Sequence, residues 1–210
     1  MRHGLAAPLV TLVLMSPLLA NGAGAAPITY TETTTATGTL GGTAFTNSQV
    51  TVSFAGDTSG VTSLAPGVLI NPAGVATVTV AGLSAATFTG TGIAAADDQA
   101  FGGAGIGAEG SGPPPSAGQG GSPPLILGTN AAAFATYDLT SAIGPVTGSS
   151  TIAAGSSYQT SSGAFVLNSA GNATFTATTA ASAVPEPMSV ALMGAGLLGF
   201  GLTRRRARTA

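Results

Sequence analysis

Short runs in the middle of the chain alternate apolar and hydroxyl-bearing residues, and this alternation constrains the fold more than any other feature of the sequence. It recurs at residues 28–31 (Ile-Thr-Tyr-Thr), 50–54 (Val-Thr-Val-Ser-Phe), 78–80 (Val-Thr-Val) and 173–177 (Ala-Thr-Phe-Thr-Ala). Side chains of a β-strand point alternately to two faces, so a period of two with β-branched and aromatic residues is typical of half-buried strands. The middle of the chain is therefore expected to be all-β.

Two turn signals separate further apolar runs. Residues 71–74 (Asn-Pro-Ala-Gly) carry Pro at the second position and Gly at the fourth, as a β-turn favours. This turn is predicted to join residues 68–70 to residues 75–80 as a hairpin. Residues 169–172 (Ser-Ala-Gly-Asn) are predicted to join residues 165–167 to the final strand in the same way.

These signals predict one ectodomain over residues 26–183, folded as a single antiparallel β-sandwich of jelly-roll type. A β-solenoid is the alternative, although no fixed repeat period is present. Residues 102–124 interrupt the pattern with nine Gly and five Pro, so we expect a flexible surface loop there. A boundary between two small domains is the other interpretation. Each half would then have fewer than about 80 residues and no disulfide, which makes independent folding doubtful.

Basic residues are absent between the two ends of the chain. Residues 27–184 contain 27 Thr and 17 Ser but no Lys, Arg, His or Cys. This composition excludes a basic nucleic-acid surface, a disulfide framework and a catalytic triad, because a Ser or Thr nucleophile would have no His or Lys as its base. The acidic residues of this region are Glu32, Asp57, Asp97, Asp98, Glu109 and Asp138.

Asp97 and Asp98 form the only adjacent acidic pair. A glycosidase needs two carboxylates about 5–9 Å apart across the scissile bond, whereas adjacent residues of a strand point to opposite faces. We therefore predict no catalytic residue, no enzyme activity and no cofactor. A hydrolase is the alternative if two carboxylates among Asp57, Asp97 or Asp98, Glu109 and Asp138 meet in a cleft. Calcium binding by Asp57, Asp97 or Asp98 is a candidate function, since hard cations take carboxylate oxygens, but no calcium-loop spacing is present. The default expectation is that these residues are solvated turn positions without a metal.

Residues 1–25 have the features of a secretory signal peptide. Residues 2–3 (Arg-His) give a positive start, residues 5–20 form an apolar run, and Ala23 and Ala25 supply the small-x-small pattern of a cleavage site. We expect cleavage after Ala25. A membrane anchor or core helix is the alternative, but the run is too short to span a bilayer and contains two prolines.

Residues 184–210 combine three features in a fixed order: a Pro-Glu-Pro motif, the uncharged stretch 188–203 and a basic cluster. A helix of that stretch would span roughly 24 Å, against about 30 Å for a bilayer core. Burying an Arg would cost about 2.5–3.5 kcal/mol, so we expect the cluster to stay on the cytoplasmic side as a membrane stop. The prolines leave Glu186 in an extended segment just outside the bilayer. The motif is Pro185, Glu186 and Pro187, and the cluster is Arg204, Arg205, Arg206 and Arg208.

This ordered triple resembles the PEP-CTERM sorting tail of Gram-negative bacteria that make exopolysaccharide. The resemblance covers residues 185–208. It implies that the tail holds the protein in the inner membrane for exosortase, a transpeptidase-like membrane enzyme, and that processing near residues 185–187 releases or transfers the ectodomain. The catalytic residues of that step then lie in the exosortase, and Glu186 is a recognition element. An ordinary single-pass anchor is the alternative.

The sequence thus predicts a secreted, exosortase-processed structural protein of the cell surface or extracellular matrix. Its expected partners are signal peptidase, exosortase, the inner membrane in transit, and either exopolysaccharide or copies of itself. Self-association is expected because the edge strands lack the charged side chains that usually prevent edge pairing. The alternative is a lectin-like module that binds glycan or calcium through an acidic and aromatic cluster, for which only Tyr30, Tyr137 and Tyr158 supply polar aromatic side chains.

Overall fold

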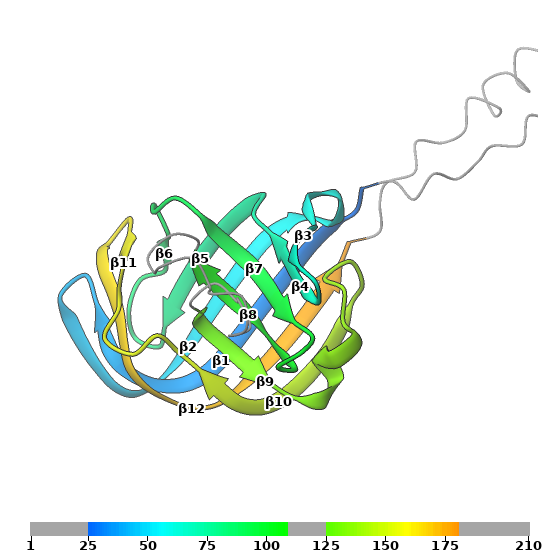
Figure 1. The fold of residues 1–210 in the computed structure, drawn as a ribbon. Coiled ribbons are helices and arrows are strands. Elements are labelled where there is room, and N and C mark those ends of the chain that lie inside the picture. The colour runs from blue at the N-terminus through cyan, green and yellow to red at the C-terminus, as the bar shows by residue number, and fades with distance from the viewer. Residues whose placement is uncertain (1–24, 109–124, 181–210) are drawn as a thin grey trace, which may run out of the picture.

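The computed structural model describes residues 25–108 and 125–180, and in this part of the chain it consists of β-strands and two short 3-10 helices (Figure 1). The all-β prediction is confirmed. The strands are β1 (Pro27–Leu40), β2 (Thr43–Asp57), β3 (Thr62–Ala65), β4 (Val68–Asn71), β5 (Gly74–Val80), β6 (Ala86–Thr87), β7 (Ile93–Asp98), β8 (Gly103–Ala108), β9 (Leu125–Asn130), β10 (Ile143–Thr151), β11 (Ser157–Thr160) and β12 (Gly163–Thr179). The 3-10 helices are η1 (Thr58–Gly60) and η2 (Ala132–Thr136).

All strand pairs are antiparallel, and they form one continuous sheet in the order β3-β4-β7-β8-β9-β10-β12-β1-β2-β5-β6, with β11 on β12. Strand β10 joins the two halves, because Ile143–Gly148 pairs with β12 and Ser149–Thr151 pairs with β9. The sheet folds back on itself, so that β7, β8 and β9 cover β1, β2 and β5 (Figure 1). We call β1, β2, β5 and β12 the long-strand layer, and β4, β7, β8 and β9 the short-strand layer.

The two-layer arrangement agrees with the coarse prediction of packed antiparallel sheets, but the layers belong to one sheet instead of two. The pairing does not support a β-solenoid, in which successive repeats stack along one direction. Within the described residues, no helix is both long and apolar enough to cross a membrane. The predicted signal peptide and the predicted transmembrane stretch 188–203 lie outside the described residues, apart from Ala25.

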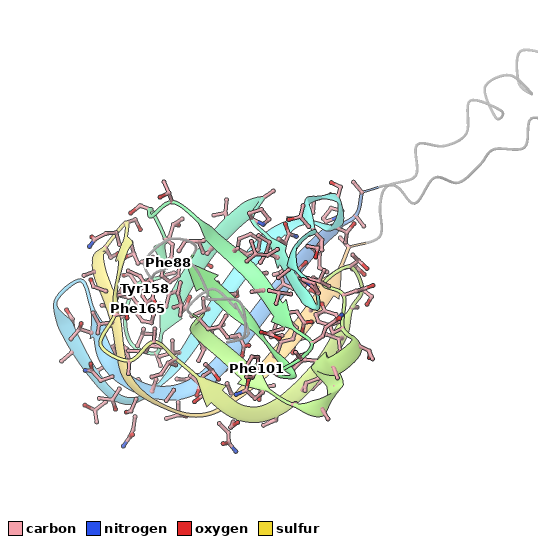
Figure 2. All side chains as sticks on the ribbon, in the orientation of Figure 1. Phe88, Phe101, Tyr158 and Phe165 are labelled. Carbon is pink, nitrogen blue, oxygen red and sulfur yellow. The ribbon has the colours of Figure 1, made fainter. Side chains whose placement is uncertain are left out.

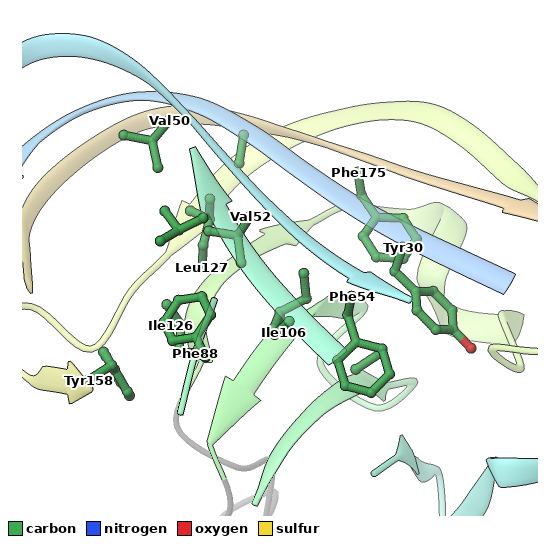
Figure 3. Close-up of a cluster of buried hydrophobic side chains, with 14 of the residues drawn as sticks. Tyr30, Val50, Val52, Phe54, Phe88, Ile106, Ile126, Leu127, Tyr158 and Phe175 are labelled. Carbon is green, nitrogen blue, oxygen red and sulfur yellow. The ribbon is translucent and has the colours of Figure 1, made fainter. Parts of the chain in front are cut away.

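The long strands show the alternation that the sequence predicts. Along β1, side chains are buried at every second position, and all four alternating runs of the sequence lie in β1, β2, β5 or β12. The buried side chains pack between the layers (Figure 3), where Phe175 lies 5.3 Å from Phe134 and 6.3 Å from Tyr30 between ring centroids. A second aromatic group, Phe88 and Phe165 with Tyr158, lies at the other end of the domain (Figure 2).

A two-residue turn joins β1 to β2. Gly41 and Gly42 have φ values of 58° and 82°, a left-handed conformation that suits Gly and matches the twist of a tight hairpin. This turn fixes the register of the longest hairpin in the domain, in which Leu40 is opposite Thr43 and Pro27 is opposite Asp57.

The predicted hairpin around residues 71–74 is wrong. Strand β4 pairs with β3 and β7, whereas β5 pairs with β2 and β6, so this turn carries the chain from one layer to the other. The buried Asn71 holds the corner, because its Nδ2 donates to the Asp57 carbonyl (2.9 Å) and to the Tyr30 hydroxyl (3.2 Å). The chain bends at Ala73, but the turn signal does not determine which strands pair afterwards.

The second predicted hairpin, around residues 169–172, is also wrong. Gly163–Thr179 is one strand that follows β1 along most of its length. Its register with β1 shifts between Thr34 and Ala36, and the Thr34 hydroxyl lies within hydrogen-bonding distance of the carbonyls of Gly171 (3.2 Å) and Asn172 (2.9 Å). The Gly and Asn therefore mark a β-bulge rather than a reversal of the chain.

The loop predicted at residues 102–124 is wrong for its first part, because Gly103–Ala108 forms strand β8 with all six residues buried. An added Cβ at Gly105 would lie 2.5 Å from the Cα of Gly128 on β9 and 2.5 Å from the Leu127 carbonyl oxygen. The glycines thus allow a close backbone approach inside the sheet. Residues 109–124 lie outside the described residues.

Candidate functional sites

The residues predicted to direct sorting lie outside the described part of the chain, so the structure shows only where the two tags attach. These residues are Pro185, Glu186, Pro187, Arg204, Arg205, Arg206, Arg208 and Ala23. Of the predicted cleavage site, Ala25 is described, and it is exposed two residues before β1. At the other end, Ala180 follows β12 directly.

Strand β1 begins where β12 ends (Figure 1). Ile28 is opposite Thr179, and the Ala180 amide donates to the Pro27 carbonyl at 3.0 Å. Ala26 is fixed on the other side, since its amide donates to the Thr58 hydroxyl (3.0 Å) and its carbonyl accepts from the Thr58 amide (2.9 Å). We call this part of the domain, with η1 and the corner at residues 71–74, the terminal end. The opposite part, with the Gly41-Gly42 turn, is the far end.

Two carboxylates lie near the terminal end. Asp57 caps η1, and hydrogen bonds from the hydroxyl (2.6 Å) and amide (2.8 Å) of Ser59 lower its pKa. Asp138 precedes Leu139, whose carbonyl accepts a hydrogen bond from Tyr30 of β1. Slight burial would raise the pKa of Asp138, but hydrogen bonds from the amide of Thr140 and from hydroxyls outweigh this effect and lower it. Both carboxylates are therefore ionised at neutral pH.

Asp97 and Asp98 are buried at the end of β7, which contradicts the expectation of solvated turn positions. The Asp98 carboxylate accepts hydrogen bonds from the amides of Ala100 (3.1 Å) and Phe101 (3.2 Å), at the start of the turn to β8. Asp97 has no exposed surface, and neither of its carboxylate oxygens has a hydrogen-bond partner. Burial, with the nearby charges of Asp98 and Asp138, raises the pKa of Asp97 to about 8.

A third buried carboxyl was missed from the sequence. Glu32 lies in the middle of β1 with no exposed surface, and its Oε2 accepts a hydrogen bond of 2.8 Å from the Thr129 hydroxyl of β9. Burial raises the pKa of Glu32 well above its usual value, although the hydrogen bonds from Thr129 oppose the shift. Asp97 is therefore a neutral acid below about pH 8, and the pKa of Glu32 is shifted in the same direction. The signal was present in the sequence, because Glu32 occupies an inward position in the alternation between Tyr30 and Thr34.

The buried acids are not arranged as a surface site. Asp97 is opposite Ala104, and Ala104 is opposite Thr129, so the three residues form one lateral row of the short-strand layer. This row faces the interior, where Thr129 meets Glu32 of the other layer. Hydrolysis of a glycan would require carboxyl groups that a sugar can reach. Glu32 instead connects the two layers through its hydrogen bond with Thr129, and Asp97 is buried in the space between them.

The features expected of a lectin-like site do not come together in the described residues. Tyr30, Tyr137 and Tyr158 are all buried, and the hydroxyls of Tyr30 and Tyr137 donate to the backbone carbonyls of Leu139 (2.6 Å) and Ser141 (3.0 Å). Among residues 25–108 and 125–180, no group of three or more acidic or histidine side chains is placed to hold a metal ion. Glu109 lies outside these ranges.

The outer surface of the long-strand layer carries an ordered array of hydroxyls, which we call the threonine face. Thr33 is opposite Thr174 on one side and Thr51 on the other, and Thr51 is opposite Thr79. The hydroxyls of Thr174 and Thr147, on β10, lie 2.8 Å apart. None of the residues of the array is charged. They are Thr29, Thr31, Thr33, Thr51, Ser53, Thr77, Thr79, Thr174, Thr176 and Thr178.

A small hollow of about 180 Å³ lies at the far end. Its lining is uncharged and mixes hydroxyl and apolar groups, and it includes no buried polar side chain. The lining residues are Leu40, Gly41, Thr43, Leu83, Ser84 and Ser162. The hollow offers no charged group or metal ligand to a small molecule.

Comparison with known proteins identifies one feature. A family model described as the PEP-CTERM protein-sorting motif matches residues 183–206. No curated protein and no solved structure matches the chain. The match contains the Pro-Glu-Pro motif, the uncharged stretch and the first three Arg residues of the cluster.

Proposed function

Since this chain carries a PEP-CTERM protein-sorting motif, which implies exosortase processing and sorting to the cell surface, we propose that it is a structural protein of the extracellular matrix that adheres to exopolysaccharide. In this proposal the signal peptide directs export and the tail anchors the protein transiently in the inner membrane. Exosortase then cuts near residues 185–187 and the ectodomain passes to the surface or the matrix. The chain itself contributes recognition and binding, while catalysis belongs to the processing enzymes.

The threonine face is the observation that supports adhesion. A Thr or Ser hydroxyl both donates and accepts hydrogen bonds, and so does each hydroxyl of a polysaccharide. Neighbouring strands lie about 4.8 Å apart, so the face offers hydroxyls and methyl groups in closely spaced rows. Such contacts are weak singly and are commonly bridged by water. Binding along a long polymer then gains strength from many simultaneous contacts.

The charge distribution favours an uncharged polymer as the partner. Residues 27–184 carry acidic side chains and no basic one, so a polyanion would be repelled by the domain as a whole. The threonine face itself has no charge, which removes the cost of desolvating ions at the contact. A neutral glycan is therefore the expected ligand class, and other copies of the domain are the competing partner.

A binding assay with matched variants tests the proposal. Thr31, Thr33, Thr51 and Thr174 are changed together to Val, which keeps the shape and the β-propensity while removing the hydroxyls. The control changes four exposed Thr outside the face to Val: Thr62, Thr89, Thr91 and Thr136. We expect cosedimentation with purified neutral matrix polysaccharide to be lost in the first variant and retained in the control. Equal binding by both variants, or none by the unaltered protein, would refute adhesion through this face.

Processing is tested separately by the intact mass of protein recovered from the matrix of a producing cell. The expected mass lacks Arg204–Arg206 and Arg208, and a Glu186→Ala variant is expected to accumulate in the membrane fraction. Recovery of matrix protein that still contains the Arg cluster would contradict the exosortase proposal without affecting the adhesion proposal.

A further inference from the structure

We propose that the terminal end of the domain is its membrane-facing surface and that the far end projects away from the bilayer while the tail remains anchored. This inference rests on the proposed anchoring by the sorting tail. It goes further by assigning which face of the folded domain lies against the membrane and what holds it there.

The pairing of the terminal strands carries the proposal. Ile28 is opposite Thr179, and the Ala180 amide is hydrogen-bonded to Pro27, so β1 and β12 bring both attachment points to one end of the sheet. These two strands are neighbours along most of their length, which makes the seam between them a central part of the fold. The attachment point of the tail therefore cannot move to another part of the surface without opening the sheet.

The length of the connection limits how far the terminal end can lie from the bilayer. Eight residue steps separate Ala180 from Met188, where the uncharged stretch begins. A fully extended chain of this length reaches about 29 Å at most. Strand β1 has 14 residues, and its thirteen residue steps correspond to about 43 Å from the terminal end to the far end. The segment from Ala180 to Met188 is thus shorter than the domain. While the tail is anchored, the terminal end therefore lies no farther from the membrane than the length of this segment.

The charges of the terminal end indicate that the tail alone holds the domain in this position. Asp57 and Asp138 lie at or near this end with lowered pKa values, and residues 27–184 contain no basic side chain that could bind anionic headgroups. Anionic lipids attract basic segments and repel acidic ones over about a Debye length. Cleavage of the tail is therefore expected to release the domain completely.

The chain has no Cys, so one introduced thiol can be labelled specifically. Thr179→Cys places a dye at the terminal end and Thr43→Cys places one at the far end, and both positions are exposed. The full-length protein is reconstituted in vesicles of phosphatidylethanolamine and phosphatidylglycerol that contain a lipid-linked energy acceptor. Thr179 is opposite Ile28 and Thr43 is opposite Leu40, so the two positions are about 40 Å apart along the strand. Transfer from the Thr179→Cys dye is therefore expected to exceed that from the Thr43→Cys dye about twofold or more.

Ala73→Cys, an exposed position at the corner between β4 and β5, provides a second terminal-end probe if Thr179→Cys disturbs β12. Equal transfer from the two ends, or greater transfer from the far end, in protein that floats with the vesicles would overturn the orientation and leave anchoring intact. Failure of the full-length protein to float with the vesicles would overturn the anchoring and the orientation together. A domain that stays on the vesicles after the tail is cut would overturn the inference that the tail alone holds it.

Discussion

The two layers of the domain are built from different kinds of sequence. In the long-strand layer, β1 and its neighbours alternate buried apolar residues with Thr or Ser on the outside. In the short-strand layer, β7 and β8 consist almost entirely of Ala, Gly and Asp, and nearly all their residues are buried. The first layer therefore meets water on one side, whereas the central strands of the second are covered on both.

This difference explains which strands the sequence could predict. Alternation arises when one face of a strand is solvated, and a strand covered on both faces loses it. In β8 the Gly residues fit a close approach to β9, but Gly in a sequence is also the usual mark of a loop. The same chain thus contains strands that are easy to recognise and strands that resemble linkers.

The largest expected effect concerns the two acids buried between the layers, Asp97 of the short-strand layer and Glu32 of the long-strand layer. The pKa of Asp97 is raised from 3.8 to about 8, so its contribution to stability is complete below about pH 4 and is lost as the pH rises to about 8. Over this window the free energy of unfolding should fall by about 1.4 kcal/mol per pH unit. Glu32, with its pKa also raised, adds in the same direction. Asp97→Asn is expected to flatten the profile, measured by urea unfolding across this pH range.

Asp57→Asn is the control for that measurement, because Asp57 is not among the charges that raise the pKa of Asp97. The pKa of Asp57 is lowered, so its contribution is present above the unfolded value of 3.8 and disappears only as the pH falls below it. The control should leave the slope between pH 4 and 8 unchanged. A stability profile of the unaltered protein that is flat in this window would contradict the assignment of Asp97 as a neutral buried acid.

Loss of a core ring in the long-strand layer should have the next largest effect. Phe175 is fully buried and packs against Phe134, Tyr137 and Tyr30. Phe175→Ala is expected to lower the free energy of unfolding by about 3–5 kcal/mol, because the site loses apolar contacts and gains a cavity. Thr176→Ala, the next residue on the outer face, is the control and should change stability by less than about 0.5 kcal/mol.

Overpacking in the short-strand layer tests the close approach of β8 and β9. Gly105→Ala would place a Cβ 2.5 Å from backbone atoms of both Gly128 and Leu127, and we expect a loss of about 1–3 kcal/mol. Gly90→Ala is the matched control, since an added Cβ there meets no atom within 4 Å. If both variants unfold at the same urea concentration as the unaltered protein, the close contact between these strands is not required.

The smallest expected effect lies on the threonine face. The hydroxyls of Thr147 and Thr174 are 2.8 Å apart and solvent-accessible, and cross-strand pairs of this kind contribute about 0.2–1 kcal/mol. A double-mutant cycle with Thr147→Ala and Thr174→Ala should give a coupling energy in this range. A much larger coupling would mean that the face is part of the structural framework instead of a surface available for binding.

The sequence located positions where the strands are interrupted, but it did not predict which strands pair on either side of them. The chain bends within residues 71–74, yet it passes to the other layer there, because the Asn71 side chain bonds to Asp57 and Tyr30, which are distant in the sequence. Gly171 and Asn172 form a bulge because Thr34 binds their carbonyls. Such partners lie outside any local sequence window, so a local pattern cannot distinguish a hairpin from a corner or a bulge.

The candidate sites also divide into those made of contiguous residues, which the sequence predicts, and those made of residues from distant strands, which it does not. The sorting tail was recognised from the sequence because its function depends on the order of a short motif, an apolar stretch and a basic cluster, all contiguous in the chain. The burial of Asp97 and the Glu32–Thr129 contact were not recognised, since each depends on a strand from a distant part of the chain. The predicted exposed roles of Asp97 and Asp98 were wrong for this reason.

The sequence by itself determined that this protein has alternating β-strands, no basic residue in its middle region and a sorting motif, because these properties belong to single residues and to neighbours along the chain. Only the tertiary structure decided that β1 and β12 lie side by side, that Gly103–Ala108 is a buried strand and that two acids lie between the layers. Pairing and burial depend on contacts between residues that are distant in sequence, and the free energy that selects among such contacts belongs to the whole folded chain.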